Sequence, residues 1–202
     1  MSYINDTTCS TLTNYDKGTD CFEPYDGGVG RKGLIAEFTK EEFASITKAP
    51  DKSITDIVMK SGKKFYTLLI KEDSGLAEIE STLQDSGSRE KIDRFSLQAE
   101  LQEAEHFNFF EELEKSSRYW FVIVPLEGES DSNTDRYMGF GHDGGLQNTS
   151  WKWTSGKRGE FSGFDASFEN KTKDIGRLIK ADATKYTTGN AELIDSLLTP
   201  AQ

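Results

Sequence analysis

The chain has 202 residues, of which 35% are hydrophobic and 29% are charged, so it suits one domain with a modest core. Its 35 acidic and 24 basic side chains give a formal net charge of −11, which argues against a protein that grips nucleic acid through the phosphates. The longest apolar run has six residues, from Tyr119 to Val124, whereas a membrane span needs about 20. We therefore expect no membrane segment.

Residues 1–33 are rich in Thr, Asn, Asp and Gly and show no periodicity, which predicts an extended N-terminal arm. The first residues form neither a basic nor an apolar leader, so we expect no secretory signal and assembly in a cytoplasm. Cys9 and Cys21 are the two cysteines. Reduced thiols are the rule in that compartment, and the sequence leaves open whether the two cysteines pair.

The first regular elements follow in residues 34–70. Residues 34–38 predict a strand, and residues 40–46 predict a single helical turn or a loop. Residues 54–59 and 65–70 are β-rich and flank a short connection that contains Gly62. Two such runs around a short glycine-containing connection predict a β-hairpin.

Residues 72–102 predict a long two-stranded arm. Apolar and polar residues alternate from Phe95 to Gln102, and more weakly over residues 76–83. This alternation is typical of strands with one buried and one wet face. The stretch between them, residues 85–91, is too polar for a core and predicts a flexible tip.

The period changes after Glu105, where Phe107, Phe110 and Leu113 recur every third residue and predict one amphipathic helix. Further strands are expected at residues 118–126, 136–140, 146–154 and 159–169. Roughly eight strands without βαβ alternation predict an antiparallel β-sandwich or barrel with one flanking α-helix. The sandwich domain is expected over residues 34–180, with the arm at 72–102, and a C-terminal tail with a short helix over residues 181–202.

Two ligand-binding patterns occur, each in the wrong context. Residues 28–33 spell G-x-G-x-x-G, but a dinucleotide site needs a helix after it and here a strand follows, so a glycine hinge is the better interpretation. Residues 131–135 begin like a calcium loop, but Arg136 replaces the required glycine and His142 replaces the closing Glu. We expect no cofactor and no metal.

Nothing in the sequence forms a catalytic motif. The two histidines are His106 and His142, and no nucleophile elbow, zinc-protease, P-loop or C-x-x-C pattern is present. His142 lies in a glycine-rich turn, where a solvated imidazole is the simplest expectation. We therefore expect no enzyme, and a turnover abolished by His142→Ala would overturn that expectation.

Charge is distributed unevenly along the chain. Residues 71–105 carry ten acids and four bases, net −6, and residues 151–185 carry eight bases and five acids, net +3. Opposite charges on one chain can meet between neighbouring subunits, although both segments can equally be solvated surface. The residues predicted to form an oligomer interface are Glu78, Glu80, Asp85, Arg89, Glu90, Lys91, Arg94, Lys157, Arg158, Lys171 and Lys173.

These features resemble a known family. Asp20-Cys21 and Gly27-Gly28 are similar to the opening of structural proteins from phages of Bacteroidetes hosts, including crAss-like phages. The later half resembles the tail tube proteins of tailed phages. The resemblance rests on the strand 95–103, the helix 107–115, the strand 119–126, Gly144-Gly145-Leu146, the turn at Thr154-Ser155-Gly156-Lys157 and the final strand 166–171 with its Phe168-Glu169 pair.

The resemblance covers roughly residues 20–175 and implies a self-assembling β-sandwich, tail-tube-like, whose hairpin serves ring closure and stacking. The implied partners are further copies in a ring, other tail or portal proteins, and genomic DNA that passes without specific binding. The implied location is the virion tail, after assembly in the host cytoplasm. The long loop 127–135 and the stretch after Asp174 depart from the pattern and leave a portal-proximal tail ring protein as an alternative.

A different class of function is also open, a small acidic β-sandwich module that binds a carbohydrate or a protein. Trp151 and Trp153 would share one face of a strand. Such a pair is most often core, then subunit interface, then a sugar platform.

Overall fold

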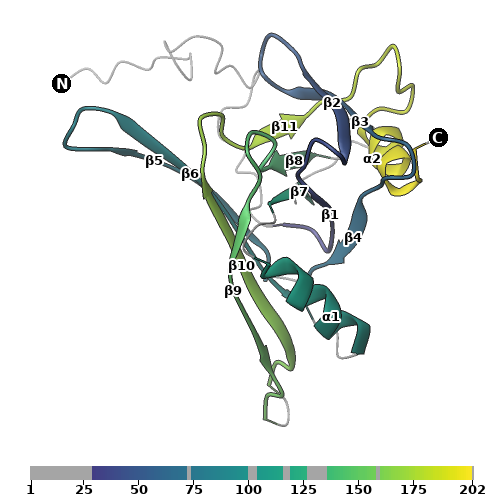
Figure 1. Ribbon diagram of the computed structural model, residues 1–202. Helices are drawn as coiled ribbons and strands as arrows, with labels where there is room; N and C mark the ends of the chain where they lie inside the picture. Colours follow the sequence, from purple (N-terminus) through teal and green to yellow (C-terminus); the bar gives the residue numbers. More distant parts are fainter. Residues whose placement is uncertain are drawn as a thin grey trace, which may run out of the picture.

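The computed structural model describes residues 29–71, 74–99, 104–115, 119–126, 136–157 and 160–201. This part of the chain forms a seven-stranded sheet, a four-stranded sheet and two helices (Figure 1). The predicted class is therefore confirmed: the protein is mainly β, a sandwich or barrel-like fold with a flanking helix and a long hairpin. Neither described helix is long and apolar enough to cross a membrane.

The seven-stranded sheet is built around β7 (Trp120–Pro125), which contains residues 120–124 of the longest apolar run of the sequence. Alternate side chains of β7 enter the two cores on the two faces of the sheet: Trp120 and Val122 on one, Phe121 and Ile123 on the other. A strand buried on both faces has this continuous apolar character. In spatial order the sheet contains β2 (Phe43–Lys48), β3 (Ile54–Met59), β11 (Arg177–Ile179), β8 (Tyr137–Phe140), β7, β1 (Lys32–Glu37) and β4 (Tyr66–Leu69).

The four-stranded sheet is antiparallel throughout and has the order β5 (Leu76–Leu83), β6 (Arg89–Ala99), β10 (Gly163–Lys171), β9 (Gln147–Thr154). The predicted alternation is present in β6, where Phe95, Leu97 and Ala99 are buried and the residues between them are half-buried. One face of this sheet therefore packs on the body, and the other is open.

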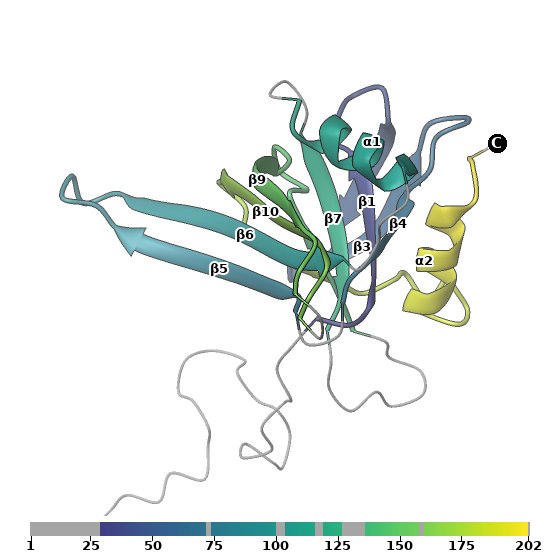
Figure 2. The ribbon, with the colours of Figure 1, turned by 90° about the horizontal axis from the view of Figure 1, so that it is seen from below.

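The β5–β6 hairpin forms the predicted arm and projects well beyond the body (Figures 1 and 2). Its strands pair from Leu76 opposite Ser96 to Leu83 opposite Arg89. The tip is closed by a hydrogen bond from Gln84 N to Ser88 O of 2.8 Å. Gly87 has φ of 80°, a left-handed conformation that glycine adopts without strain.

Two hydrophobic cores hold the layers together. The first lies between the two sheets and includes α1 (Ala104–Leu113), whose Phe110 ring stacks on Phe164 of β10 with centroids 4.2 Å apart. The second lies on the other face of the seven-stranded sheet and is covered by α2 (Asn190–Leu198) through Leu193 and Leu197 (Figure 2). The C-terminal helix is thus part of a core.

Two local predictions were wrong. Residues 43–46 belong to β2, because this segment pairs with β3 along the sheet. The β3 and β4 strands exist but do not pair with each other: β3 pairs with β2 and β11, whereas β4 pairs with β1. The connection between them binds the C-terminal segment instead, with hydrogen bonds from Phe65 N to Leu197 O and from Gly62 N to Ala201 O.

Candidate assembly surface

A charged network crosses three strands of the four-stranded sheet. The Arg94 guanidinium on β6 contacts Glu80 of β5 through Nη1, at 2.6 Å, and Glu169 of β10 through Nε, at 2.8 Å. A second ion pair joins Lys171 at the end of β10 to Glu90 of β6. Part of the acidic arm and part of the basic segment therefore meet within one chain.

The other residues of the predicted interface are dispersed. Glu78 lies opposite Arg94 on β5. Asp85 lies in the tip turn, Arg89 and Lys91 lie on β6, and Lys157 and Lys173 lie in loops. Arg158 is outside the described residues. The structure brings Glu80, Glu90, Arg94 and Lys171 together, and the inter-subunit role of the whole set stays a prediction.

The two faces of the arm differ in chemistry, because residues paired across antiparallel strands share a face. The face that continues the buried side of the sheet carries Ile79 and Leu83, which are 38% and 62% exposed. Arg89 and Lys91 lie beside them on this face. The inner face of the arm, defined by these four residues, is therefore apolar and basic.

The open face of the four-stranded sheet is polar and acid-rich. It carries no aromatic side chain among the described residues, and Gln98 Nε2 donates to Asp165 Oδ1 across β6 and β10 at 2.7 Å. Five acids and three bases lie on it: Glu78, Glu80, Glu90, Asp165, Glu169, Arg94, Lys152 and Lys171. Ser96, Gln98, Ser150 and Ser167 lie on the same face, together with the apolar residues Leu76 and Ile92.

The sheet also ends in two unpaired strands. β5 and β9 each have a neighbour on one side only within the described part of the chain. β5 is exposed along almost its whole length. Such edges are templates for pairing with another chain.

His142 corrects the expectation of a solvated imidazole, because its side chain is fully buried. The turn after β8 carries it inward, and Gly141 before it has φ of 79° with Trp120 O close to where a Cβ would lie. His142 Nε2 lies 3.3 Å from Asp174 Oδ2. Burial and the Lys48 ammonium lower the pKa of His142, although Asp174 opposes the change.

Asp174 contacts three charged or titratable side chains, Lys48, His142 and Arg177. Its carboxylate accepts hydrogen bonds from Lys48 Nζ at 2.7 Å and from Arg177 Nε at 2.9 Å. Burial works in the opposite direction, but these bonds and His142 hold the pKa of Asp174 well below its usual range. An aspartate that is ionised at neutral pH and held by two cations is suited to a structural tie between β2 and β11.

Asp93 is the most deeply buried carboxyl described. It is 1% exposed, and its Oδ2 has no hydrogen-bond partner among the described residues. Burial raises the pKa of Asp93 to about 6, although hydrogen bonds from the backbone N–H groups of Gly176 and Gly141 oppose the shift. In the sequence, Asp93 is a polar residue two positions before the apolar residues of β6 that face the core. The alternation of polar and apolar residues therefore gave no sign that this carboxyl is buried.

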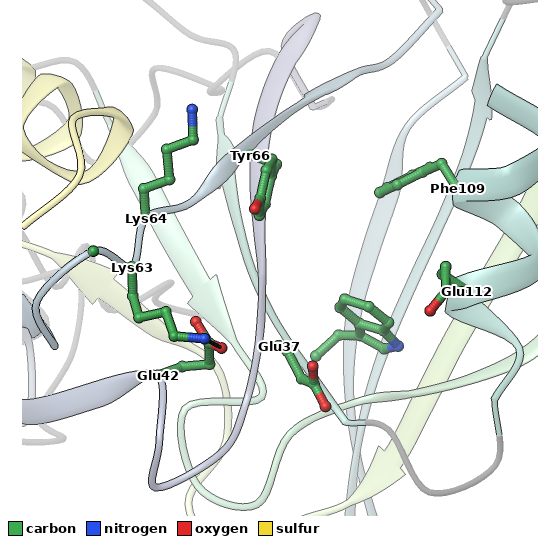
Figure 3. Close-up of a pocket in the computed structure, with 9 residues that line it drawn as sticks. Glu37, Glu42, Lys63, Lys64, Tyr66, Phe109 and Glu112 are labelled. Carbon is green, nitrogen blue, oxygen red and sulfur yellow. Dashed lines mark hydrogen bonds and ion pairs between the residues drawn. The ribbon is translucent and has the colours of Figure 1, made fainter. Parts of the chain in front are cut away.

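A pocket of about 280 Å³ lies between the edge strand β4, the end of β1 and α1 (Figure 3). Aromatic side chains form its walls, with carboxylates among them and two lysines at one side. The residues that line it are Glu37, Glu42, Gly62, Lys63, Lys64, Tyr66, Phe109, Glu112 and Trp120. They come from five distant segments, so no local pattern in the sequence predicted the pocket.

Charges in the pocket are segregated. Lys63 forms an ion pair with Glu42 at 2.6 Å, and the Lys64 ammonium lies 5.6 Å from the centroid of the Tyr66 ring. Figure 3 shows both lysines on the far side of Tyr66 from Phe109 and Glu112. The part of the pocket next to α1 is aromatic and contains the Glu112 carboxylate, which forms an ion pair with Lys115 of the same segment.

No family model, curated protein or solved structure matches this chain. The resemblance to the tail tube family consequently stays a prediction.

The two tryptophans share a face of β9, as predicted, and that face is the buried one. Trp151 packs against the first core, and its Nε1 donates to Glu114 Oε2 at 2.5 Å. Trp153 is 41% exposed and contacts Phe107, with ring centroids 5.8 Å apart. The pair attaches α1 to the sheet.

Metal and cofactor patterns gain no support. The described residues contain no group of three or more potential metal ligands, and the calcium-like segment 131–135 lies outside them. β1 begins at Lys32, within the glycine pattern, and Gly30 N donates a hydrogen bond to Pro125 O at 2.8 Å. The helix N-terminus that a dinucleotide site requires does not follow this motif.

Proposed function

We propose that this chain is a non-enzymatic virion structural protein that self-assembles into rings and forms part of a phage tail tube or a portal-proximal tail conduit. The genome would pass through the rings without specific binding. The proposal follows the resemblance stated above and is supported by the construction of the four-stranded sheet.

The observation that carries the proposal is the pair of free edges on one sheet. Strand directions alternate along β5, β6, β10 and β9, so β5 of one copy would continue antiparallel from β9 of the next. Every junction would then have the same hydrogen-bond pattern as the sheet itself. A head-to-tail contact of this kind closes into a ring when its rotation allows.

The open face gives such a ring a suitable lining. Its five acids and three bases leave it net negative, and duplex DNA is held mainly by basic groups that neutralise phosphates. A lumen lined by this face would repel the phosphate backbone and let DNA slide. The Ser and Gln residues on this face would keep the lining of the lumen hydrated.

The alternative, a carbohydrate- or protein-binding module, has one favourable observation in the partial exposure of Trp153. Its indole shares the buried face of β9 and contacts Phe107, which leaves less of the ring for a ligand. Glycan binding that is lost in Trp153→Ala would favour this alternative.

Native mass spectrometry and negative-stain electron microscopy of the full chain test the proposal. We expect one defined ring stoichiometry and annular particles. A chain that stays monomeric across the micromolar range and binds glycans would contradict the proposal and support the alternative.

A further inference from the structure

We propose that the junction between the arm strand β6 and the loop 172–176 is a pH-sensitive switch, closed while the Asp93 carboxyl is protonated and able to open locally once this carboxyl is ionised. Opening would free the root of the arm, the point at which β6 leaves the body. The inference does not depend on ring assembly, since every contact that supports it lies within one chain. It is carried by the burial of Asp93 and by the hydrogen bonds around it.

Asp93 is the outermost buried position of β6. The following inward residues, Phe95, Leu97 and Ala99, are buried in the first core, whereas Lys91, the next residue outward on the same face, is only half-buried. Beyond this point the hairpin projects away from the body (Figures 1 and 2). A local opening at Asp93 would therefore release the arm and leave the first core intact.

The loop 172–176 connects the two sheets, because it follows β10 and precedes β11. Two of its backbone N–H groups donate to the arm strand: Thr172 N to Lys91 O at 3.0 Å and Gly176 N to Asp93 Oδ1 at 3.1 Å. Both hydrogen bonds have to break when the root of the arm moves away from the loop.

Ionisation places a poorly solvated charge in this junction. Asp93 is 1% exposed, and its Oδ2 has no hydrogen-bond partner among the described residues. A buried charge without full hydrogen bonding is costly. Water reaches the carboxylate when the junction opens, so ionisation favours the open form. Burial raises the pKa of Asp93 to about 6, which places the change between acidic and neutral pH.

The side chains packed around Asp93 supply no ion-pair partner within the described part of the chain. Ile79 and Asn170, opposite Asp93 on β5 and β10, carry no charge. Asp174 in the loop raises the pKa of Asp93, and Arg177 of β11 lowers it by a smaller amount. The charge of an ionised Asp93 is therefore left to the backbone N–H groups and to water.

Three further titratable or charged side chains face the loop. His142 and Asp143 come from the turn after β8, and Lys48 comes from β2; all three contact Asp174. Burial lowers the pKa of His142, so its protonation in acid opposes the effect of Asp93. A comparison of two proteins that both contain His142 removes this contribution.

Hydrogen exchange with single-residue resolution, measured on the dilute full chain, tests the switch. The exchange rates of the Thr172 and Gly176 amides, corrected for the intrinsic effect of pH, give the opening constant of the junction. Asp93→Asn keeps the size of the side chain and cannot ionise. Asp165→Asn is the matched control, because it makes the same change on the open face of β10, where Asp165 accepts a hydrogen bond from Gln98.

We expect the ratio of the wild-type to the Asp93→Asn opening constant to rise about 100-fold between pH ~4 and pH ~7, because the pKa of Asp93 shifts from 3.8 to about 6 on burial and each pKa unit is a factor of ten. Asp165→Asn should match the wild type at every pH. A ratio that does not vary with pH would overturn the inference.

The wild type alone supplies a second criterion. Its Thr172 and Gly176 amides should exchange faster than the Val122 amide of the buried strand β7. Equal rates would mean that the junction opens only when the whole protein unfolds, which would also overturn the inference. Neither failure bears on ring assembly, which is measured separately.

Discussion

The backbone N–H of Gly176 donates a hydrogen bond of 3.1 Å to Asp93 Oδ1, and this contact joins the four-stranded sheet to the seven-stranded sheet. Asp93 is an arm-strand residue, whereas Gly176 immediately precedes β11. The arm is therefore attached to the body by a buried carboxyl as well as by apolar packing. The ionisation of that carboxyl connects pH to stability.

Asp93→Asn should stabilise the protein at pH ~8. The pKa of Asp93 is raised from 3.8 to about 6, so the folded state binds more protons than the unfolded state between these values, and stability falls as the pH rises through this window. Each pKa unit is worth about 1.4 kcal/mol. We expect Asn to raise the free energy of unfolding by about 1 to 3 kcal/mol in urea titrations.

The pH profile supplies the control for that variant. The advantage of Asn over the wild type should shrink as the pH falls through about 6 toward about 4, because the wild-type carboxyl becomes neutral. His142 changes stability in the opposite direction in acid, but it is present in both proteins and cancels in the difference. A difference that does not vary with pH would refute the assigned role of Asp93.

Asp174→Asn should destabilise the fold by about 2 kcal/mol at neutral pH, because Lys48 and Arg177 lose their shared ionised partner. The pKa of Asp174 is held low, so its contribution is present above the unfolded value of 3.8 and is lost as the pH falls through the lower folded value. Urea unfolding at pH ~7 and pH ~3 measures this loss. Equal destabilisation at both pH values would show that packing, and not charge, is responsible.

Phe164→Ala should cost about 3 to 5 kcal/mol. Phe164 is completely buried and stacks on Phe110, so truncation opens a cavity under α1. Phe161, a half-buried residue in the preceding loop, offers a matched control whose Phe161→Ala variant should cost much less. Similar losses in the two variants would mean that α1 is not held by this contact.

Lys152→Glu should weaken ring assembly, because Lys152 lies on the open face of the edge strand β9 and Glu78 lies on the open face of the edge strand β5. A junction between these two edges would bring their opposite charges onto one face, although Lys152 also lies 3.5 Å from Asp165 of its own chain. Glu78→Lys in the same chain should restore part of the loss. Exposed pairs are worth about 0.2 to 1 kcal/mol each, repeated at every junction. Lys60→Glu, the same charge change just after β3, should leave assembly unchanged in native mass spectra.

The sequence predicted the parts of the fold that depend on local periodicity. Apolar residues alternate with polar ones over residues 95–99, which predicted a strand with one buried face, and β6 is present there. Phe107, Phe110 and Leu113 recur every third residue, which predicted a helix with one buried face, and α1 is present there. Partner choice is not local: β3 and β4 look like a hairpin, yet the Phe65 N–H bonds to Leu197, more than a hundred residues away.

In the candidate site, too, local sequence features were predictable and contacts between distant residues were not. Charge counting located Glu80 and Lys171 but could not show that they bind residues of their own chain, Arg94 and Glu90. The burial of His142 depends on where β8 and β7 meet, which a glycine-rich turn does not reveal. The residues that line the pocket come from separate segments of the chain, so no sequence pattern predicted it.

Hydrogen exchange of the edge strands, measured on the assembled and the diluted chain, tests the central claim most directly. Backbone amides of β5 and β9 that face away from the sheet should exchange rapidly in the monomer and slowly in the ring, while amides of β6 and β10 stay protected in both. Rings whose β5 and β9 amides exchange as fast as those of the monomer would contradict assembly through continuation of the four-stranded sheet.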